Sequence, residues 1–207
     1  MLNRLLRATV TKILGPIAHL FLKLGISPDI VTIVGTIGVS VGALGFFPRG
    51  QIWVGVLVIT AFVFSDTIDG IMARSSGGSS KWGAYLDSTL DRIGDAAIFG
   101  GLVLYYAGMG ENSLMAGLAL ACLILGSVVS YARARAEGLG FRADVGIAER
   151  ADRLVAVLVA AFFADLFNST LLLGIVLGLL AVASFVTVVQ RMLTVRTQAL
   201  AAGEVKH

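Results

Sequence analysis

The sequence predicts an all-α membrane protein, with six transmembrane helices preceded by an N-terminal amphipathic helix that lies in the membrane interface. Of the 207 residues, 57% are hydrophobic and only 14% are charged, whereas soluble domains carry about 25% charged residues. Apolar stretches of roughly 18 residues or more recur, and each is long enough to cross a hydrocarbon core of about 30 Å. These observations exclude an ordinary soluble domain, and one membrane domain accounts for the whole length.

The N-terminal segment, residues 1–25, interleaves apolar residues with arginines and lysines. This pattern is typical of an amphipathic helix on a membrane surface. A signal peptide is the alternative, but Pro16 and His19 interrupt the apolar run and no clear small-residue cleavage site follows. We therefore expect an interfacial helix over residues 1–25 and the membrane domain over residues 26–207.

The expected spans account for the placement of the basic residues. With the N-terminus in the cytoplasm, every lysine and arginine except Arg49 lies on the cytoplasmic side, as the positive-inside rule requires. We therefore expect a multi-pass protein of the cell membrane with both termini in the cytoplasm. The spans are predicted at residues 30–47, 52–74, 83–108, 113–132, 148–167 and 169–189.

Four carboxylates lie at the adjoining ends of the second and third spans. Asp66 and Asp69 are three residues apart, and Asp87 and Asp91 are four apart, so each pair shares one helix face. Antiparallel neighbouring helices place both pairs on the same membrane side, where four carboxylates would repel one another without a cation among them. Oxygen ligands suit Mg²⁺, Mn²⁺ or Ca²⁺, and a single cysteine, Cys122, excludes a Cys-based metal site.

The residues around the aspartates suit a phosphorylated ligand. Gly70 and Ala73 share the face of the first aspartate pair and leave room for a ligand close to the backbone. Arg74, one turn beyond Gly70, offers a guanidinium fork to phosphate. The following loop, residues 75–82, is rich in serine and glycine and can supply hydroxyl and amide donors.

The pattern in residues 66–91 reads D-x2-D-G-x2-A-R-x8-G-x3-D-x3-D. It resembles the signature of the CDP-alcohol phosphotransferase family, and the six spans after an amphipathic helix resemble that family's fold. The resemblance implies an enzyme that uses two divalent cations, Mg²⁺ or alternatively Mn²⁺. It also implies a homodimer that acts on lipid in the membrane, and we expect no nucleic-acid partner.

The resemblance further implies roles for single residues. Two metal ions lie among Asp66, Asp69, Asp87 and Asp91, and Asp91 is also the catalytic general base toward the acceptor hydroxyl. The residues expected to bind the donor, CDP-diacylglycerol, are Asp29, Thr32, Gly70, Arg74 and Ser80. The family more often has asparagine at the position of Asp29, and the segment Ser27-Pro28-Asp29 also has the composition of an ordinary helix N-terminus.

Arginines near the ends of the last three spans suit an anionic acceptor. Residues 130–153 resemble the corresponding segment of actinobacterial family members that use inositol 1-phosphate. Guanidinium groups bind phosphate through paired donors, although such arginines also serve as positive-inside anchors that bind lipid headgroups. The residues expected to bind the acceptor phosphate are Arg133, Arg153 and Arg191, with Arg135 and Arg196 in reserve.

The expected reaction joins CDP-diacylglycerol to inositol 1-phosphate and gives phosphatidylinositol phosphate and CMP. The nearest alternative is the same chemistry with glycerol 3-phosphate, which gives phosphatidylglycerophosphate. An alternative of another class is a metal-ion transporter or a noncatalytic lipid-binding membrane protein that uses the acidic cluster. Acceptor competition separates the first two functions, and CMP release excludes the third.

Overall fold

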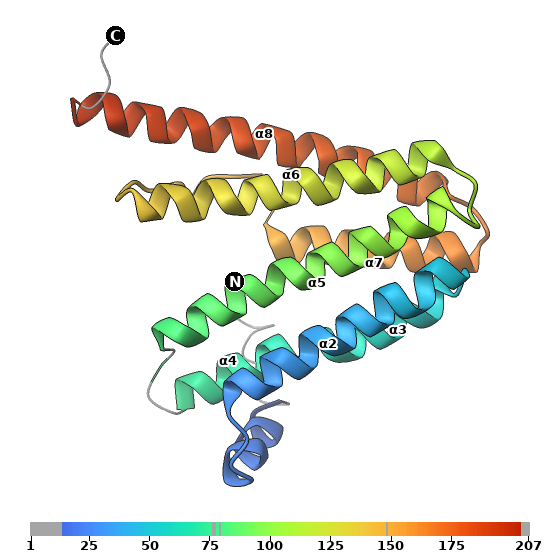
Figure 1. The fold of residues 1–207 in the computed structure, drawn as a ribbon, viewed down its shortest axis with the longest axis horizontal. Helices are drawn as coiled ribbons and strands as arrows, with labels where there is room; N and C mark the ends of the chain where they lie inside the picture. Colours follow the sequence, from blue (N-terminus) through green and yellow to red (C-terminus); the bar gives the residue numbers. More distant parts are fainter. Residues whose placement is uncertain (1–13, 76–77, 79, 148, 204–207) are drawn as a thin grey trace, which may run out of the picture. The chain divides into compact units, whose positions relative to one another are not determined.

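A computed structural model of the chain describes residues 14–75, 78, 80–147 and 149–203. Every regular element in these ranges is helical (Figure 1), which confirms the predicted all-α class. After a helical segment at residues 14–23, the elements in chain order are α2 (Pro28–Phe46), the 3-10 helix η1 (Phe47–Arg49), α3 (Ile52–Val63), α4 (Ser65–Ser75), α5 (Lys81–Ala107), α6 (Ser113–Gly138), α7 (Arg150–Leu166) and α8 (Leu171–Ala201).

Four of the helical stretches have the length and apolar composition needed to cross a membrane. They are Pro28–Arg49, Ile52–Ser75, Ser113–Gly138 and Leu171–Ala201. Helix α5 is long, with 27 residues, but its N-terminal half carries several charged side chains. Helix α7 has 17 residues, which is the lower limit of about 17 for a span. The sequence predicts six membrane spans, and the part of that prediction that concerns α5 and α7 stays a prediction.

The chain divides into two compact units that are described separately. One contains Met1–Phe46 and Val54–Ile98, and the other contains Phe47–Trp53 and Phe99–His207. All four aspartates of the family pattern belong to the first unit, and the candidate acceptor arginines belong to the second.

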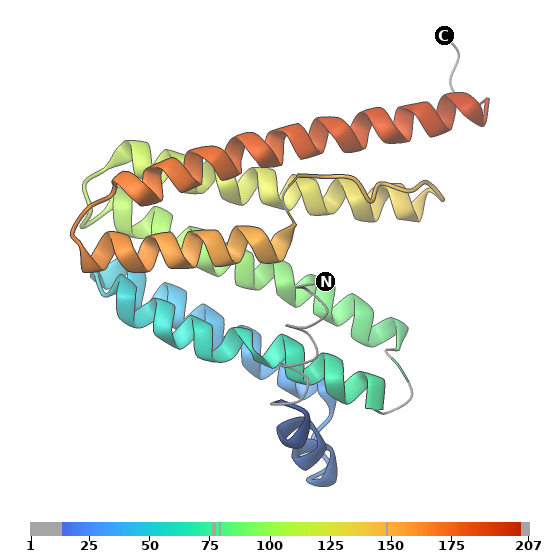
Figure 2. The same cartoon turned by 180° about the vertical axis from the view of Figure 1, so that it is seen from behind.

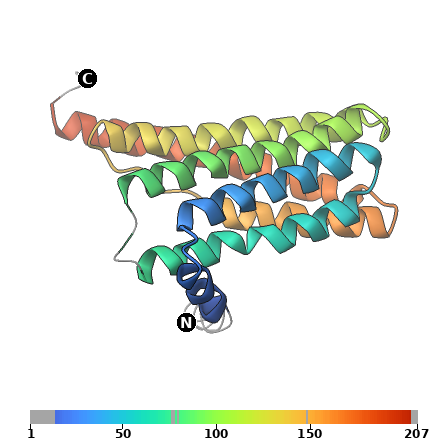
Figure 3. The same ribbon diagram turned by 60° about the horizontal axis from the view of Figure 1, so that its bottom comes forward.

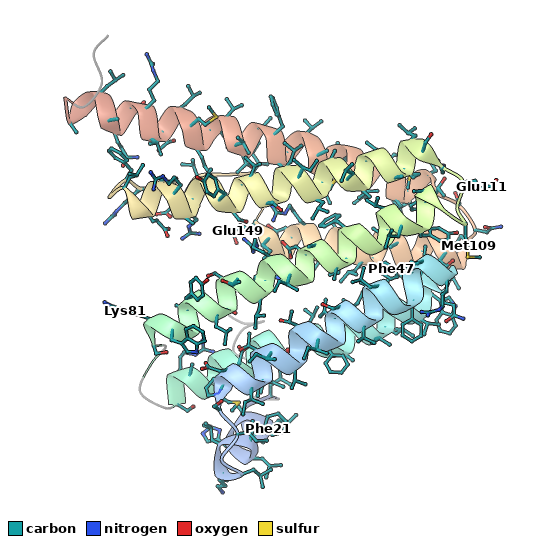
Figure 4. The ribbon with its side chains drawn as sticks, in the orientation of Figure 1. Phe21, Phe47, Lys81, Met109, Glu111 and Glu149 are labelled. Atoms are coloured by element: carbon teal, nitrogen blue, oxygen red, sulfur yellow. The ribbon has the colours of Figure 1, made fainter. Side chains whose placement is uncertain are left out.

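The N-terminal helical segment packs on the first unit through one apolar side. Ala18 is fully buried in a cluster with Ile71 and Met72 of α4. Phe21 of the same segment, labelled in Figure 4, packs against that cluster. Leu20 is exposed, so the described part of the segment carries apolar side chains on more than one side. The predicted helix over residues 1–25 is described only from residue 14; its residues 1–13 lie outside the described ranges.

Helix α2 packs closely on α3 and α4 in the first unit, and Figure 3 shows these helices side by side. A methyl group on Gly38 would overlap the Phe62 ring, and one on Gly35 would overlap the Ser65 side chain. Glycine at these positions lets the helix backbones approach, as small residues do between membrane helices.

The expected span over residues 52–74 agrees with the helical stretch Ile52–Ser75, but the helix is interrupted within it, because α3 ends at Val63 and α4 begins at Ser65. Ser65 Oγ donates to the Phe62 carbonyl at 2.6 Å, and this carbonyl lies at the end of α3. A serine that bonds a preceding carbonyl competes with the helical hydrogen-bond ladder. The apolar run ends at Phe64, beside the break, and polar residues open α4. A fall in hydropathy marks the end of an apolar run and does not by itself reveal that the helix is interrupted there.

In the second unit, α6 and α8 lie side by side and run in the same direction, while α7 runs in the opposite direction against α8 (Figures 1 and 2). Both parallel helices are longer than predicted. Helix α6 continues to Gly138 and α8 to Ala201, whereas the apolar runs predicted ends at residues 132 and 189. Hydropathy marks the apolar part of a helix, and the polar turns that follow have good helix formers.

Candidate functional site

The first turn of α2 supplies one side of the candidate site. Pro28 is the first residue of the helix, a position where the missing backbone N–H has no cost. Ser27 caps this end, since its Oγ accepts from the Ile30 N–H at 3.4 Å. Asp29 stands in the same first turn, where the helix dipole favours a carboxylate. The predicted capping pattern is confirmed.

Thr32, one turn further, bonds directly to a predicted metal ligand. Thr32 Oγ1 lies 2.5 Å from Asp69 Oδ2, and both residues are only 7% exposed. The same hydroxyl also lies 3.1 Å from the Pro28 carbonyl. A hydroxyl has one proton to donate, and the shorter contact to a charged acceptor is the stronger one. Thr32 therefore fixes the orientation of the Asp69 carboxylate.

Gly70 makes room for the Arg74 side chain on α4. A methyl group at Gly70 would lie 3.4 Å from Arg74 Nη1, so the guanidinium folds back along the helix toward the glycine. Arg74 itself is exposed. A phosphate that approaches the α4 backbone at Gly70 would thus meet a cationic fork.

The start of α5 closes the site on another side, and Figure 4 labels Lys81 at this helix end. Ser80 Oγ accepts from the Gly83 N–H at 2.9 Å, which makes Ser80 the helix cap. A methyl group at Gly83 would lie 3.3 Å from Ser80 Oγ and 3.6 Å from Asp29 Oδ1. Gly83 thus allows the Asp29 carboxylate to approach the first turn of α5.

A cavity of about 480 Å³ lies where these three helix ends meet. Its lining is mainly apolar with carboxylate and hydroxyl groups among it, which is the mixture typical of a small-molecule site. The cavity is lined by Ser27, Pro28, Asp29, Thr32, Asp69, Gly70, Ala73, Gly78, Ser80, Gly83, Ala84 and Asp87. Most of the residues predicted to bind the donor therefore surround one space.

Asp91 lies one helical turn beyond Asp87 and is outside that lining. Arg92 Nη2 lies 3.7 Å from Asp91 Oδ2 and 3.9 Å from Asp95 Oδ2. Arg92 therefore lies between two carboxylates, those of Asp91 and Asp95. Asp91 is partly exposed, which leaves its carboxylate accessible.

Of the four aspartates in the family pattern, Asp69 and Asp87 line the cavity, and carboxylate ligands fit a hard divalent cation. The side chain of Asp66 lies outside the described part of the structure. Among the described side chains, no group of three or more aspartates, glutamates, histidines or cysteines is close enough to hold a metal. The complete set of four metal-binding aspartates therefore stays a prediction.

In the second unit, three predicted acceptor arginines lie close enough for their charges to act on one another. Arg191 interacts electrostatically with both Arg133 and Arg153. Arg153 is buried, with 4% exposure, and its guanidinium packs where Gly126 leaves space. The two reserve residues, Arg135 and Arg196, are exposed on α6 and α8.

Carboxylates and carbonyls that the sequence analysis missed hold two of these arginines. Arg133 pairs with Glu137 at 2.9 Å and with Asp144 at 3.3 Å. Arg191 donates through Nε to the Val145 carbonyl at 3.0 Å and through Nη1 to the Val129 carbonyl at 2.5 Å. The spacing of Arg133 and Glu137 on one helix could have revealed the first pair; the contacts with residues 144 and 145 left no signal in the sequence.

Comparisons with known proteins agree with this arrangement. A model of the family described as CDP-alcohol phosphatidyltransferase matches residues 25–189. The chain is 51% identical over 204 residues to the phosphatidylinositol phosphate synthase of Streptomyces avermitilis, which covers 96% of this chain and 84% of that protein. It is 48% identical over 197 residues to the enzyme of the same name from Cutibacterium acnes, and this match covers 92% of this chain and 95% of that protein.

Crystal structures of the Mycobacterium tuberculosis phosphatidylinositol phosphate synthase share the fold. The structure with CDP-DAG bound has a TM-score of 0.85 and 44% identity, and the match covers 89% of this chain and 94% of that one. The complex with manganese and citrate has a TM-score of 0.83 and 43% identity, with 89% of each chain covered. The chain therefore belongs to the CDP-alcohol phosphatidyltransferase family and is a CDP-alcohol phosphotransferase enzyme.

Proposed function

We propose that this enzyme joins CDP-diacylglycerol to inositol 1-phosphate in the membrane and releases phosphatidylinositol phosphate and CMP. The observation that carries the proposal is the cavity lined by residues of the family pattern from α4 and α5 together with the first turn of α2. The relatives are named phosphatidylinositol phosphate synthases, and a related structure holds CDP-DAG. The described geometry supports a donor site in this cavity.

In the donor site, the CDP group lies against the start of α2 and the start of α5. The Asp29 carboxylate and the Ser80 hydroxyl accept hydrogen bonds from the nucleotide. Gly70 lets the pyrophosphate approach the α4 backbone, and Arg74 donates to it through paired N–H groups. The closeness of Arg74 to Gly70 and of Asp29 to Gly83 supports this placement.

Family membership and the manganese complex of a relative indicate that the enzyme uses a divalent metal. We propose two Mg²⁺ ions, with Mn²⁺ as a substitute, held by Asp66, Asp69, Asp87 and Asp91. Divalent cations at such a site offset the charge that develops on the phosphoryl oxygens. Thr32 keeps one oxygen of Asp69 oriented, and this hydrogen bond supports a site whose ligands are held in place.

Asp91 is the general base in this proposal. Its carboxylate takes the proton of an inositol hydroxyl, and the oxygen attacks the donor phosphorus that bears the diacylglycerol. The bond from that phosphorus to the oxygen bridging to CMP breaks, and CMP leaves with the electron pair. Arg92, in contact with both Asp91 and Asp95, holds the Asp91 side chain for this step.

The acceptor phosphate binds to the basic cluster of the second unit, Arg133, Arg153 and Arg191. Burial of Arg153 excludes water from its guanidinium, which strengthens a contact with phosphate. A guanidinium has five N–H donors, so the two carbonyl contacts of Arg191 leave donors for an anion. Arg135 and Arg196 are exposed and remain reserve candidates.

The proposed membrane arrangement has six spans, which adds α5 and α7 to the four helical stretches that qualify by composition. The placement of the lysines and arginines favours the cell membrane with both termini and the acidic helix ends in the cytoplasm. The enzyme is proposed to act as a homodimer, as the family resemblance implies.

The test is turnover of the purified enzyme in detergent with Mg²⁺ and CDP-diacylglycerol. Release of CMP and the lipid product are measured with inositol 1-phosphate, glycerol 3-phosphate or free inositol as the sole acceptor. We expect product with inositol 1-phosphate only. Product with glycerol 3-phosphate only would overturn the acceptor assignment and keep the chemistry, and absence of CMP with every acceptor would overturn the proposed reaction.

A further inference from the structure

An extended segment of the second unit, residues 142–147, lies along the C-terminal half of α8, which the proposed membrane arrangement places toward the cytoplasm. We name this segment the strap. It lies within the connection that returns from α6 to α7, which Figure 2 shows along the ends of α6 and α8. The side chains of Thr187, Arg191 and Gln198 contact its backbone from α8. Their spacing of four and seven residues places them on one helix face.

Gln198 holds one end of the strap with two hydrogen bonds to the same residue. Its Oε1 accepts from the Arg142 N–H at 2.9 Å, and its Nε2 donates to the Arg142 carbonyl at 2.6 Å. Both contacts are to backbone atoms, so they fix the chain whatever side chain stands at residue 142. The geometry matches one edge of a β-ladder, with an amide side chain in place of the second strand.

Thr187 holds the other end. Its Oγ1 accepts from the Ile147 N–H at 3.2 Å, and the residue is fully buried. A methyl group at Gly146 would lie 2.6 Å from Thr187 Cγ2, closer than carbon atoms pack. Glycine therefore lets the strap backbone reach the threonine at this point.

Between these two attachments, the strap contacts two of the proposed acceptor arginines. Asp144 lies 3.3 Å from Arg133 of α6, and the Val145 carbonyl accepts from Arg191 Nε at 3.0 Å. The strap thus links guanidinium groups that come from different helices. It therefore helps to orient both groups, together with Glu137 for Arg133 and the Val129 carbonyl for Arg191.

We infer that Gln198 and Thr187 are positioning residues for the acceptor site, because they hold the strap in the place from which it orients Arg133 and Arg191. This inference rests on the proposed function of those arginines. Long arginine side chains lose rotational freedom when they bind a ligand, and orienting them beforehand reduces that cost. Loss of an attachment should therefore weaken binding of the acceptor phosphate more than binding of the donor, because the described lining of the donor cavity falls within residues 27–87.

The test compares Thr187→Val with Thr187→Ser, and Gln198→Ala with Thr197→Ala. Valine keeps the bulk against Gly146 and removes the acceptor for the Ile147 N–H, whereas serine keeps the hydroxyl. Thr197 neighbours Gln198 on α8 and is exposed, and its hydroxyl donates to the Leu193 carbonyl of its own helix, so it is a matched control. Wild type and variants are assayed for the KM of each substrate and for kcat.

We expect Thr187→Val and Gln198→Ala to raise the acceptor KM about five- to tenfold, the range that loss of a neutral hydrogen bond gives. The donor KM and kcat should stay within about twofold, and Thr187→Ser and Thr197→Ala should match the wild type. Hydrogen exchange of the amides at residues 142 and 147 should accelerate in the first two variants only.

Unchanged acceptor KM with accelerated exchange would overturn the inference, because the strap would then be released without effect on the acceptor. Equal losses in both KM values and kcat would also overturn it and indicate a general structural role. If Thr187→Val does not fold, Gln198→Ala decides the matter, since Gln198 lies near the end of its helix. If the wild type shows no turnover with any acceptor, the proposed function fails. The strap is then tested by the affinity for inorganic phosphate, which should be weaker in Gln198→Ala than in the wild type; equal affinities would overturn the inference.

Discussion

Thr32 of α2 donates a hydrogen bond to Asp69 of α4 across 37 positions of sequence, with 2.5 Å between Oγ1 and Oδ2. The pair lies at the boundary between the expected donor site and the expected metal site, since both residues line the same cavity. A hydroxyl that orients a ligating carboxylate supports metal binding without touching the metal. We therefore propose that Thr32 orients Asp69 for metal binding, beside the donor contact that the sequence implied.

Replacing Thr32 by valine should weaken activation by metal. The change removes a hydrogen bond to a charged group, which is worth about 1.5–3 kcal/mol, and it leaves Asp69 buried without this donor. We expect the Mg²⁺ concentration for half-maximal CMP release to rise at least about tenfold, because a tenfold change corresponds to about 1.4 kcal/mol. A titration of activity with Mg²⁺ measures the effect.

Two variants control this prediction. Thr32→Ser keeps the hydroxyl and should stay close to the wild type. Thr36→Val makes the same change one turn along α2, where the hydroxyl donates to the Thr32 carbonyl of its own helix, and should leave the Mg²⁺ titration unchanged. Equal effects of Thr32→Val and Thr36→Val would show that helix packing, and not the bond to Asp69, determines the outcome.

Much of the donor site could be predicted because its residues are close in sequence and carry local signals. Serine before proline marks the start of α2, and the spacing of the aspartates on α4 and on α5 predicts that each pair lies on one face of its helix. The strap gave no such signal. Its contacts with Gln198 join backbone atoms to a side chain 56 positions away, and backbone atoms leave no mark in the sequence.

The interruption between α3 and α4 shows a second limit. The apolar run ends at Phe64, beside the interruption, but neither a fall in hydropathy nor a period of 3.6 shows where a hydroxyl replaces a helical hydrogen bond. Gly35 is the residue opposite this break. Only the structure, in which α2 and α4 approach closely, shows that Gly35 leaves room for the Ser65 side chain.

Gly38→Ala should destabilise the protein, because the added methyl group would overlap the Phe62 ring in a packed helix contact. Overpacking of this kind costs about 1–3 kcal/mol. Gly45→Ala is the matched control on α2, since its methyl group would come no closer than 3.9 Å to its nearest neighbour. Thermal unfolding in detergent should show a lower midpoint for the first variant alone, and a second change, Phe62→Leu, should restore part of the loss.

Asp91→Asn should abolish turnover and largely spare donor binding. Asparagine keeps the size of the side chain but cannot take a proton from the acceptor, and a general base contributes about 10²- to 10⁴-fold to the rate. Single-turnover CMP release and binding of CDP-diacylglycerol measure the two effects separately. Asp95→Asn, which alters the other carboxylate beside Arg92, should retain more of the rate; normal turnover of Asp91→Asn would remove Asp91 from the proposed mechanism.

Arg153→Lys should raise the acceptor KM by about tenfold or more, because lysine keeps the charge and loses the planar fork that binds phosphate through paired donors. Arg153 is buried, whereas Arg196 is exposed on α8, so Arg196→Lys is a matched change at a reserve position. We expect the second variant to keep the wild-type acceptor KM. A larger rise in acceptor KM for Arg196→Lys than for Arg153→Lys would show that the acceptor phosphate does not bind at the buried arginine.

Asp165 tests how far stability and catalysis separate in the second unit. Its Oδ2 accepts from the Trp53 N–H at 2.8 Å, so a carboxylate of α7 caps the first turn of α3, where backbone N–H groups lack helical partners. Asp165→Ala should cost about 1 kcal/mol, as loss of a cap does, and lower the unfolding midpoint by about 2–4 °C for a chain of this size. Asp165→Asn keeps an oxygen acceptor and should lose less. Because no predicted substrate residue contacts Asp165 among the contacts described, both KM values should stay at wild-type levels, and a selective rise in either one would give this end of α7 a part in substrate binding.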